Sequence, residues 1–423
     1  MLQQWIAALM SAAMFAAGSG TTQTAQPVAP VTLPQAITAD DWQARLARAE
    51  ENPASADYIT ARTAFDSRMG TVFLADDGEN ACVSPESLYH ALAMLAQGAA
   101  GQTKSQMMDV LGLPDAETLA AECRKAFLRT CIDDEASRVR IAGSVWVQKG
   151  QTLHPNFAST LAQDFYAETF AIDFQNPDDA ARIGQWIAGQ TEGLLAPSLT
   201  PEPDTLLSLV NTVYYRSPWL DTFQADDTRA GTFHTEDGTV TADFMHCLDQ
   251  GTIVRGDGWT RASLQLMEGS MVFVLPDAGN SVSALLKNPQ TLDDALHGGT
   301  KTTAQIDWLV PRFSFGTTCD LIDGLRTLGM TDALDVQNAD FSGLFADGIG
   351  AYLAQAIQGT KISVEEEGVE GAAYTVLTMQ ATSALVQEPE RVDFHLDRPF
   401  LFAVTLDQGA CLFLGVLANP TQG

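Results

Sequence analysis

One segment near the C-terminus has an unusual length and composition: residues 361–394 are KISVEEEGVEGAAYTVLTMQATSALVQEPERVDF. Its first residues form a predicted strand that ends in acidic residues, and Val392 opens the next predicted strand. The connection from Gly368 to Phe394 spans 26 positions, whereas loops beyond about 12–15 residues in compact domains are usually functional or disordered. Small and β-forming residues dominate it, with few charges. We therefore predict a long loop whose amino-acid composition is typical of a β-strand.

The rest of the chain mixes predicted helices and strands. Ser84-Pro85-Glu86 supplies a cap, a first-turn proline and an early acid for one helix, which is apolar on nearly every face and should be buried. Further helices are predicted over residues 40–68, 156–170 and 180–190, and strands over 139–148, 206–215, 309–315, 361–364, 392–396 and 401–417, with short strands over 231–275. With no repeat and no linker after residue 38, one α+β domain over residues 39–423 is predicted.

The N-terminus carries an apolar run of signal-peptide length, WIAALMSAAMFAA at residues 5–17. Residues 1–20 are predicted to be a signal peptide and the protein to be secreted, although residues 1–4 hold no Lys or Arg and no A-x-A site follows. Residues 21–38, rich in Thr, Ala, Gln and Pro, are predicted to be a disordered linker. No apolar run reaches the roughly 18–20 residues of a membrane-spanning helix.

Charge and cysteine spacing exclude several classes of partner. With 53 acidic and 23 basic residues the net charge is −30, and this field repels nucleic acid, heparin-like polyanions and anionic lipid. The simplest role of the acidic surface is solubility. None of the six cysteines lies in a C-x-x-C pair or at zinc-finger spacing, so no metal site and no cofactor are expected, and buried free thiols are predicted.

Catalytic motifs are missing from the sequence. It holds no G-x-S-x-G elbow, no H-E-x-x-H helix and no P-loop. The six histidines are scattered, with no i, i+4 pair. Because a triad is assembled in space and not in sequence, a hydrolase stays a formal alternative. We predict that the chain is not an enzyme.

Several segments, in order along the chain, resemble the serpin family of protease inhibitors. EEEGVEGAAYT at residues 365–375 is similar to the serpin hinge consensus, and FHLDRPFLFAV at 394–404 is similar to the family's C-terminal signature. Other blocks with this resemblance are Ser84-Pro85, FAIDF at 170–174, LVNTVYYRSPW at 209–219, VLP at 274–276, VPRF at 310–313 and FLGVLANP at 413–420. The resemblance covers residue 57 to the end. It implies a large central, mostly antiparallel sheet, further sheets, eight or nine helices and an exposed reactive-centre loop.

The resemblance also implies a mechanism. A protease attacks the loop and forms an acyl-enzyme, and the cut loop enters the central sheet as an extra strand, releasing stored strain. The implied hinge comprises Glu366, Glu367, Gly368, Val369, Glu370, Gly371, Ala372, Ala373, Tyr374 and Thr375. Strand alternation turns Val369, Gly371, Ala373 and Thr375 inward, and all four are small or uncharged. A mobile loop without function is the simplest alternative.

The family's usual spacing beyond the hinge glycine puts the bait bond at Thr382-Ser383, with Met379, Ala381 and Leu385 as alternatives. A small residue there suits an elastase- or subtilisin-like protease, and Leu385 or Met379 suits a chymotrypsin-like one. No Arg or Lys lies between Gly368 and Arg391, which disfavours trypsin-like targets. The implied partner is a serine protease, or a cysteine protease, held covalently by a monomer.

The family's switch region, which controls opening of the sheet, maps onto Ser84, Asn211, Trp219 and Gln358. Gln358 replaces the family's histidine, but it can still donate and accept hydrogen bonds. Gly371 and Tyr374 are two further departures, since the family prefers small residues other than glycine there. These departures motivate a second hypothesis, a non-inhibitory serpin that acts as a binding protein or as a plain protease substrate.

Overall fold

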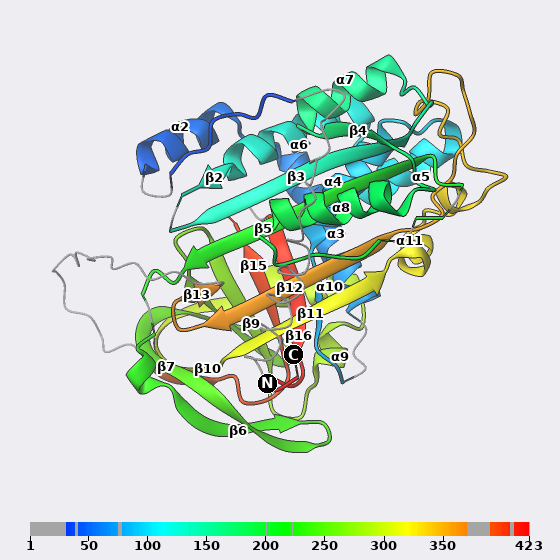
Figure 1. Cartoon of the computed structure of the whole chain (residues 1–423). Coiled ribbons are helices and arrows are strands. Elements are labelled where there is room, and N and C mark those ends of the chain that lie inside the picture. The colour runs from blue at the N-terminus through cyan, green and yellow to red at the C-terminus, as the bar shows by residue number, and fades with distance from the viewer. Residues whose placement is uncertain are drawn as a thin grey trace.

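The computed structural model describes most of the chain, namely residues 31–38, 41–74, 78–134, 136–199, 201–202, 204–221, 223–369, 390–406 and 410–422. The predicted signal peptide, residues 21–30 of the predicted linker and residues 370–389 of the loop lie outside the described residues. Two β-sheets and ten α-helices make up the described part, which confirms the α+β class against an expected eight or nine helices (Figure 1).

Seven strands form the sheet in which the loop segment begins. Their order is β11-β12-β13-β5-β3-β2, with β4 paired to β3. The bounds are β2 Ile132–Asp133, β3 Arg138–Gln148, β4 Glu168–Ile172, β5 Leu207–Pro218, β11 Phe313–Asp320, β12 Ile357–Glu365 and β13 Gly368–Val369. Only β3 and β4 run parallel, and the other paired neighbours are antiparallel.

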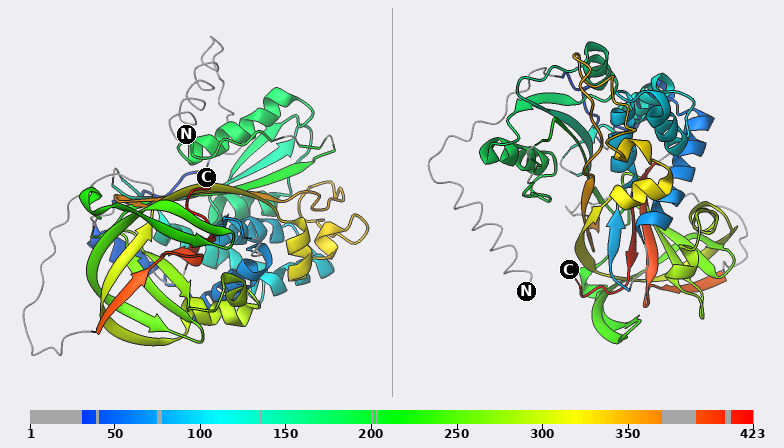
Figure 2. Two further views of the ribbon diagram at one scale, coloured as in Figure 1. Left: turned by 90° about the horizontal axis from the view of Figure 1, so that it is seen from below. Right: turned by 90° about the vertical axis from the view of Figure 1, so that its right-hand side faces the viewer.

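Nine strands form the second sheet, which is strongly curved (Figure 2). Their order is β1-β16-β15-β9-β8-β7-β10-β14, with β6 paired to β7. The bounds are β1 Ala81–Val83, β6 Arg229–Thr235, β7 Gly238–Arg255, β8 Trp259–Gln265, β9 Ser270–Pro276, β10 Thr300–Pro311, β14 Glu390–His395, β15 Phe400–Thr405 and β16 Cys411–Leu417. The strand β14, which follows the loop, pairs parallel to β10 at one end of this order.

The helices gather mainly around α4, at one end of the molecule (Figure 1). Their bounds are α2 Trp42–Glu51, α3 Ala56–Phe73, α4 Pro85–Ala96, α5 Gly101–Leu111, α6 Ala116–Thr130, α7 Pro155–Asp164, α8 Pro177–Gln190, α9 Val282–Leu285, α10 Pro289–His297 and α11 Ile322–Leu328. The predicted cap is confirmed, because the Ser84 hydroxyl accepts from the amide of Ser87 at 3.2 Å. The predicted burial of α4 is confirmed as well.

Four predicted elements are divided differently in the structure. The strand predicted over 401–417 is two strands, because β15 ends at Thr405 and β16 begins at Cys411. The helix predicted over residues 40–68 is two helices, because Pro53 interrupts it and Ser55 caps the second helix through the amide of Tyr58. The helix predicted over 156–170 ends at Asp164, since the following residues are recruited into β4. The strand predicted over 309–315 is the end of β10 and the start of β11, which are separated at Arg312.

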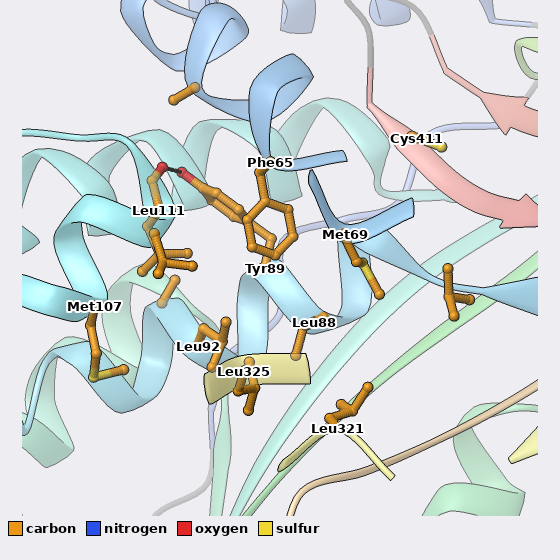
Figure 3. Close-up of a cluster of buried hydrophobic side chains, with 14 of the residues drawn as sticks. Phe65, Met69, Leu88, Tyr89, Leu92, Met107, Leu111, Leu321, Leu325 and Cys411 are labelled. Atoms are coloured by element: carbon orange, nitrogen blue, oxygen red, sulfur yellow. Dashed lines mark hydrogen bonds between the residues drawn. The ribbon is translucent and has the colours of Figure 1, made fainter. Parts of the chain in front are cut away.

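The main hydrophobic core lies between α4 and the helices around it. Figure 3 shows Phe65, Tyr89, Leu92 and Met107 converging there from α3, α4 and α5. The rings of Phe65 and Tyr89 meet edge to face at 5.1 Å, and the Tyr89 hydroxyl donates to the carbonyl oxygen of Leu111 at 3.0 Å. Burial of these large side chains, worth about 1.5–3 kcal/mol each, is what keeps the helices together.

A second core fills the space between the two sheets, and it holds Trp308, Phe313 and Phe402. On the other face of the seven-stranded sheet, α8 covers β3, β4 and β5, with Ile183 packed near the stacked rings of Trp146 and Phe170. Outside the part that α8 covers, the outer face of β12 is exposed at Ile357 and Gly359. A strand added between β5 and β12 would therefore meet an apolar layer on its inner side.

The cysteines and the end of the predicted linker complete the description. All six cysteines are described and free, with Cys82, Cys123 and Cys411 buried and the other three only half-buried. The predicted burial therefore holds for three of them. Within residues 31–38, Ile37 forms a parallel bridge to Ile132 beside β2. In the described part of the chain, every helix is too short or too polar to cross a membrane.

A buried ionic network joins α3 to α4. Arg62 contacts Glu86 at 2.8 Å and Asp66 at 3.3 Å, and His90 contacts Glu86 at 3.0 Å. Burial raises the pKa of Asp66 to about 7, although Arg62 opposes this shift. Burial also acts to raise the pKa of Glu86, but Arg62 and His90 outweigh it and hold that pKa at about 2. The two carboxyl groups thus titrate in separate pH ranges.

We predict that Asp66 makes the fold less stable as the pH rises from about 4 to about 7. Its folded pKa lies above the ordinary value of 3.8, so the folded chain binds the proton more tightly than the unfolded chain does. Glu86 acts in the opposite sense, and its contribution disappears only as the pH falls from its ordinary 4.5 toward 2. Melting temperatures between about pH 5 and pH 8 should fall for the native chain and less for Asp66→Asn.

The matched control is Asp57→Asn, which changes an exposed aspartate on the same helix. This variant should keep the pH dependence of the native chain. If Asp66→Asn and Asp57→Asn had the same pH profile, the raised pKa of Asp66 would be refuted.

Candidate functional site

The start of the loop already occupies a strand position in the seven-stranded sheet. In β13, Gly368 pairs with Pro218 of β5 and Val369 with Ser217, both antiparallel. On its other side β13 pairs with Glu365 and Val364 of β12. Val369 is 3% exposed. Figure 1 shows β13 between β5 and β12, where the chain leaves the described part.

Below β13 the sheet has no described strand between β5 and β12. Residues 207–215 of β5 pair with β3 on one edge, and residues 357–363 of β12 pair with β11 on the other. Among the described residues, no strand pairs with the two edges that face each other. Such edges leave backbone donors and acceptors available for a further strand. The geometry is a strand-shaped gap with its first two positions filled.

Gly368 has a backbone that other residues tolerate poorly. Its φ is +152°, and an added Cβ would lie 2.4 Å from the carbonyl oxygen of Ser217 and 2.6 Å from the Cα of Pro218. Only glycine therefore allows the turn from β12 to approach β5 this closely. Gly368, the glycine of the predicted hinge, therefore allows the close approach of β13 to β5.

Trp219 fixes the end of β5 to the hinge. Its indole Nε1 donates to the carbonyl oxygen of Glu365 at 2.8 Å, and its backbone amide donates to the carbonyl oxygen of Glu367 at 3.2 Å. The side chain is 2% exposed and meets Phe223 edge to face at 5.8 Å. Trp219 therefore holds the top of β12 beside β5 through two hydrogen bonds.

The acidic hinge residues differ in their surroundings. Glu366 accepts from the Thr228 hydroxyl at 2.7 Å and lies 3.4 Å from the Arg312 guanidinium, whereas Glu367 is exposed. The Ser217 hydroxyl also supports this end of β5, because it accepts from the amide of Glu268 at 2.9 Å. Thr228, Arg312 and Ser217 also support the hinge, although no motif in the sequence marks them for this role. They come from distant elements, so no spacing in the sequence could have found them.

Three of the four predicted switch residues gather under the middle of the gap. The amide of Ser84 donates to Gln358 Oε1 at 2.8 Å, and Gln358 Nε2 donates to the carbonyl oxygen of Ser84 at 2.9 Å. Ser84 is 2% exposed and Gln358 is 7% exposed. The glutamine that replaces the family's histidine thus joins β12 to the start of α4. Trp219 is not part of this group, since it lies eight residues, about 26 Å, along β5 from Asn211.

Asn211 adjoins the same group from β5. The Ser87 hydroxyl donates to its carbonyl oxygen at 3.2 Å. Its side-chain Oδ1 is buried and has no hydrogen-bond partner among the described residues. A buried acceptor without a donor costs about 1–3 kcal/mol. The gap therefore contains an acceptor that an entering strand could satisfy.

The remaining predicted site residues lie outside the described part of the chain. These are Glu370, Gly371, Ala372, Ala373, Tyr374 and Thr375 of the hinge, the bait residues Thr382 and Ser383, and the alternatives Met379, Ala381 and Leu385.

Comparison with known proteins identifies the family. The family model described as Serpin (serine protease inhibitor) matches residues 61–420. An uncharacterised serpin-like protein of Thermococcus kodakarensis is 31% identical over 370 residues, 83% of each chain. Serpin-Z2A of Oryza sativa subsp. japonica is 31% identical over 417 residues, 85% of this chain and 97% of that protein. The chain therefore belongs to the serpin family.

The solved structures agree with the fold. The thermophilic serpin tengpin in its native state superposes with a TM-score of 0.77 at 23% identity, covering 94% of this chain and 100% of that one. The resemblance inferred from the sequence and the serpin fold are confirmed. The family description names an inhibitor and not a catalyst, in agreement with the prediction that the chain is not an enzyme.

We predict that Gly368→Ala displaces β13 from the sheet, because the new Cβ cannot coexist with the backbone of Ser217 and Pro218. The cost should be about 1–3 kcal/mol. Hydrogen exchange of residues 361–369, followed by mass spectrometry, should become faster. The matched control is Gly359→Ala on β12, where an added Cβ meets nothing within 4 Å. Equal exchange in the two variants would contradict this role of Gly368.

Proposed function

We propose that this serpin inhibits a serine protease irreversibly by inserting its cleaved loop into the gap between β5 and β12. The observation that carries the proposal is the position of Val369, which already pairs with both strands above two edges that lack a described partner. A chain that continued downward from Val369 would satisfy both edges at once. The completed ladder would make the inserted state much more stable than the starting state.

The register of β13 fixes what the inserted strand would meet. Each step forward from Val369 is one step back along β5 and one step back along β12. Continued without a shift, this register sets Thr375 opposite both Asn211 and Gln358. Residues 370–379 would span about 33 Å and reach Leu207, the end of β5. A cut at Thr382-Ser383 falls just beyond this end, so it would release enough chain to fill the gap.

The facing surfaces favour this register. Residues 213 and 215 of β5 and residues 360, 362 and 364 of β12 point inward and are buried. Directly opposite residues of an antiparallel pair share a face, so Gly371, Ala373 and Thr375 would also point inward. The Thr375 hydroxyl would then lie near Asn211 Oδ1, the buried acceptor without a partner. Gln358 is already engaged with Ser84 through both of its polar groups, so Asn211 is the available acceptor.

The proposal includes the setting in which the inhibitor works. The apolar run at residues 5–17 supports export, so the target is an extracellular protease. Small residues at the bait and the lack of Arg and Lys from 369 to 390 favour an elastase- or subtilisin-like enzyme. The net charge of −30 disfavours nucleic acid and polyanion cofactors. The inhibitor acts as a monomer with one protease per chain.

A second candidate function is a non-inhibitory serpin that binds a ligand or is simply cut. Gly371 and Tyr374 favour it, because glycine weakens strand propensity by about 0.5–1 kcal/mol and tyrosine is bulky. Tyr374 would face outward, toward the side of the sheet that α8 covers. The two candidates differ in what happens after the loop is cut.

We predict that the purified protein forms a covalent complex with pancreatic elastase or subtilisin. A band at the summed mass should survive boiling in detergent on a gel. Chymotrypsin serves as the comparison for a bait at Leu385 or Met379, and trypsin serves as the negative control. Mass spectrometry of the released C-terminal peptide should place the cut at Thr382-Ser383.

The same digests separate the two candidate functions. An inserting loop should raise the melting temperature of the cleaved protein well above that of the intact protein. Cleavage by all four enzymes with neither a stable band nor a thermal shift would refute the inhibitor proposal for them. It would support the non-inhibitory serpin.

We predict that Ala373→Arg converts the inhibitor into a substrate. Its side chain would have to enter the apolar layer opposite Val213, and an unpaired buried charge is strongly disfavoured. The matched control, Ala372→Arg, places the same side chain on the opposite face of the strand, which lies under α8 only in part. The ratio of covalent complex to cleaved protein should collapse at Ala373→Arg and fall less at Ala372→Arg. An equal ratio in both would refute the register.

A further inference from the structure

Four side chains capable of binding a metal converge on the outer face of the nine-stranded sheet. His246 lies on β7, Asp307 on β10, and Asp393 and His395 on β14. Asp393 is paired directly opposite Asp307, and both histidines are paired opposite Leu309. Directly opposite residues share a face of the sheet. All four side chains therefore project from one patch, which we call the three-strand cluster.

The distances within the three-strand cluster are short. His246 Nε2 lies 3.0 Å from Asp307 Oδ1, and His395 Nε2 lies 3.9 Å from the same oxygen. The ligand atoms of Asp307, Asp393 and His395 all lie within 4.8 Å of one another. A tetrahedral ion with bonds of about 2.0–2.2 Å holds its ligands about 3.4 Å apart. Asp307, Asp393 and His395 need only small side-chain rotations to reach that spacing, whereas His246 contacts only Asp307 of these three and would have to turn toward the other two.

The carboxylate of Asp393 lacks a partner of opposite charge among the described residues, and a bound cation would supply one. This exposed carboxylate has no hydrogen bond or ion pair among the described residues, although it is paired opposite a second carboxylate. Two like charges so placed repel each other. Arg391 does not relieve this repulsion at Asp393, because its guanidinium contacts Asp307 Oδ2. That contact leaves Asp307 Oδ1 facing the histidines.

The cluster is also accessible and suitably charged. The side chains of His246 and His395 are 43% and 36% exposed, so an ion can enter from solvent. Among the described residues, the charged groups that face the site are the two carboxylates and Arg391. The net charge of −30 on the whole chain adds a long-range attraction for cations.

We propose that the three-strand cluster binds a divalent transition-metal ion, with Zn²⁺ the preferred one, through His246, Asp307, Asp393 and His395. Two imidazoles and two carboxylates form a ligand set typical of Zn²⁺ rather than of Ca²⁺ or Mg²⁺, which take oxygen ligands. The Arg391 guanidinium forms an ion pair with Asp307 Oδ2 and so orients Oδ1 of the same carboxylate toward the site. Sequence analysis predicted no metal site, because the four ligands are spread over 150 residues and follow no motif.

The bound ion would fasten an edge strand. Among the described residues, β14 pairs only with β10, and it follows directly on the loop at residue 390. An ion that joins β14 to β10 and β7 stabilises this attachment in proportion to its own binding free energy. This inference does not depend on whether the protein inhibits a protease.

The test is calorimetric titration of ZnCl₂ into the full chain, purified without a histidine tag in a buffer free of chelators. One site is expected. Asp393→Asn and His395→Gln should each weaken it by at least about tenfold, the loss already seen when an outer-sphere partner of a metal ligand is removed. Asp393 is exposed, so Asp393→Asn should fold normally, which its melting temperature without metal will verify.

Two controls exclude unspecific binding. His297→Gln alters another half-exposed histidine, which contacts only Asp293 at 3.0 Å, and it should leave Zn²⁺ affinity unchanged. Cys247→Ser removes the thiol next to His246 and should do the same. Zn²⁺ should also slow hydrogen exchange of residues 390–395 in the native chain but not in Asp393→Asn. Binding that survives both ligand variants, or no binding at all, would overturn the proposal.

Discussion

The arrangement of this serpin depends on two strand edges that face each other without a described strand between them. Residues 207–215 of β5 and 357–363 of β12 pack on apolar side chains on their inner face, and no described strand pairs with their facing backbone groups. Unpaired N–H and C=O groups at such edges strongly favour hydrogen bonding to another strand. The two residues of β13 occupy the first positions between these edges. The fold is therefore organised around a sheet that is one strand short.

The top and the middle of the gap are each held by hydrogen bonds from one side chain to backbone groups. At the top, Trp219 donates to the carbonyl oxygen of Glu365 and thereby ties β12 to the end of β5. In the middle, Gln358 bonds both to the amide and to the carbonyl of Ser84, so that β12 is tied to α4. Each bond contributes only about 0.5–1.5 kcal/mol. Separating β12 from β5 and α4 would therefore break only a few weak hydrogen bonds and cost little free energy.

Much of the fold could be predicted from the sequence, but the site could be predicted only in part. Periodicity located β3, β5 and the buried helix α4, because those elements are long and locally consistent. It failed at Pro53 and at Arg312, where short breaks divide elements that share one apolar pattern. Family motifs singled out Ser84, Asn211 and Gln358, and the structure places these residues near one another. The roles of Arg312 and Thr228 depend on tertiary contacts alone, and so does the clustering of His246 with Asp393.

The pairing of Gly368 with Pro218 has a consequence for how this gene can vary. Side chains alternate along a strand, so if the loop enters the sheet as proposed, a one-residue deletion between Gly368 and Thr375 would turn every later side chain to the other face. The ring of Tyr374 would then be directed at the narrow inner layer. Two-residue changes preserve the alternation and would be tolerated better. Over residues 369–375, selection should act on whether the number of residues is odd or even, whereas beyond the end of β5 both the length and the sequence of the loop can vary freely.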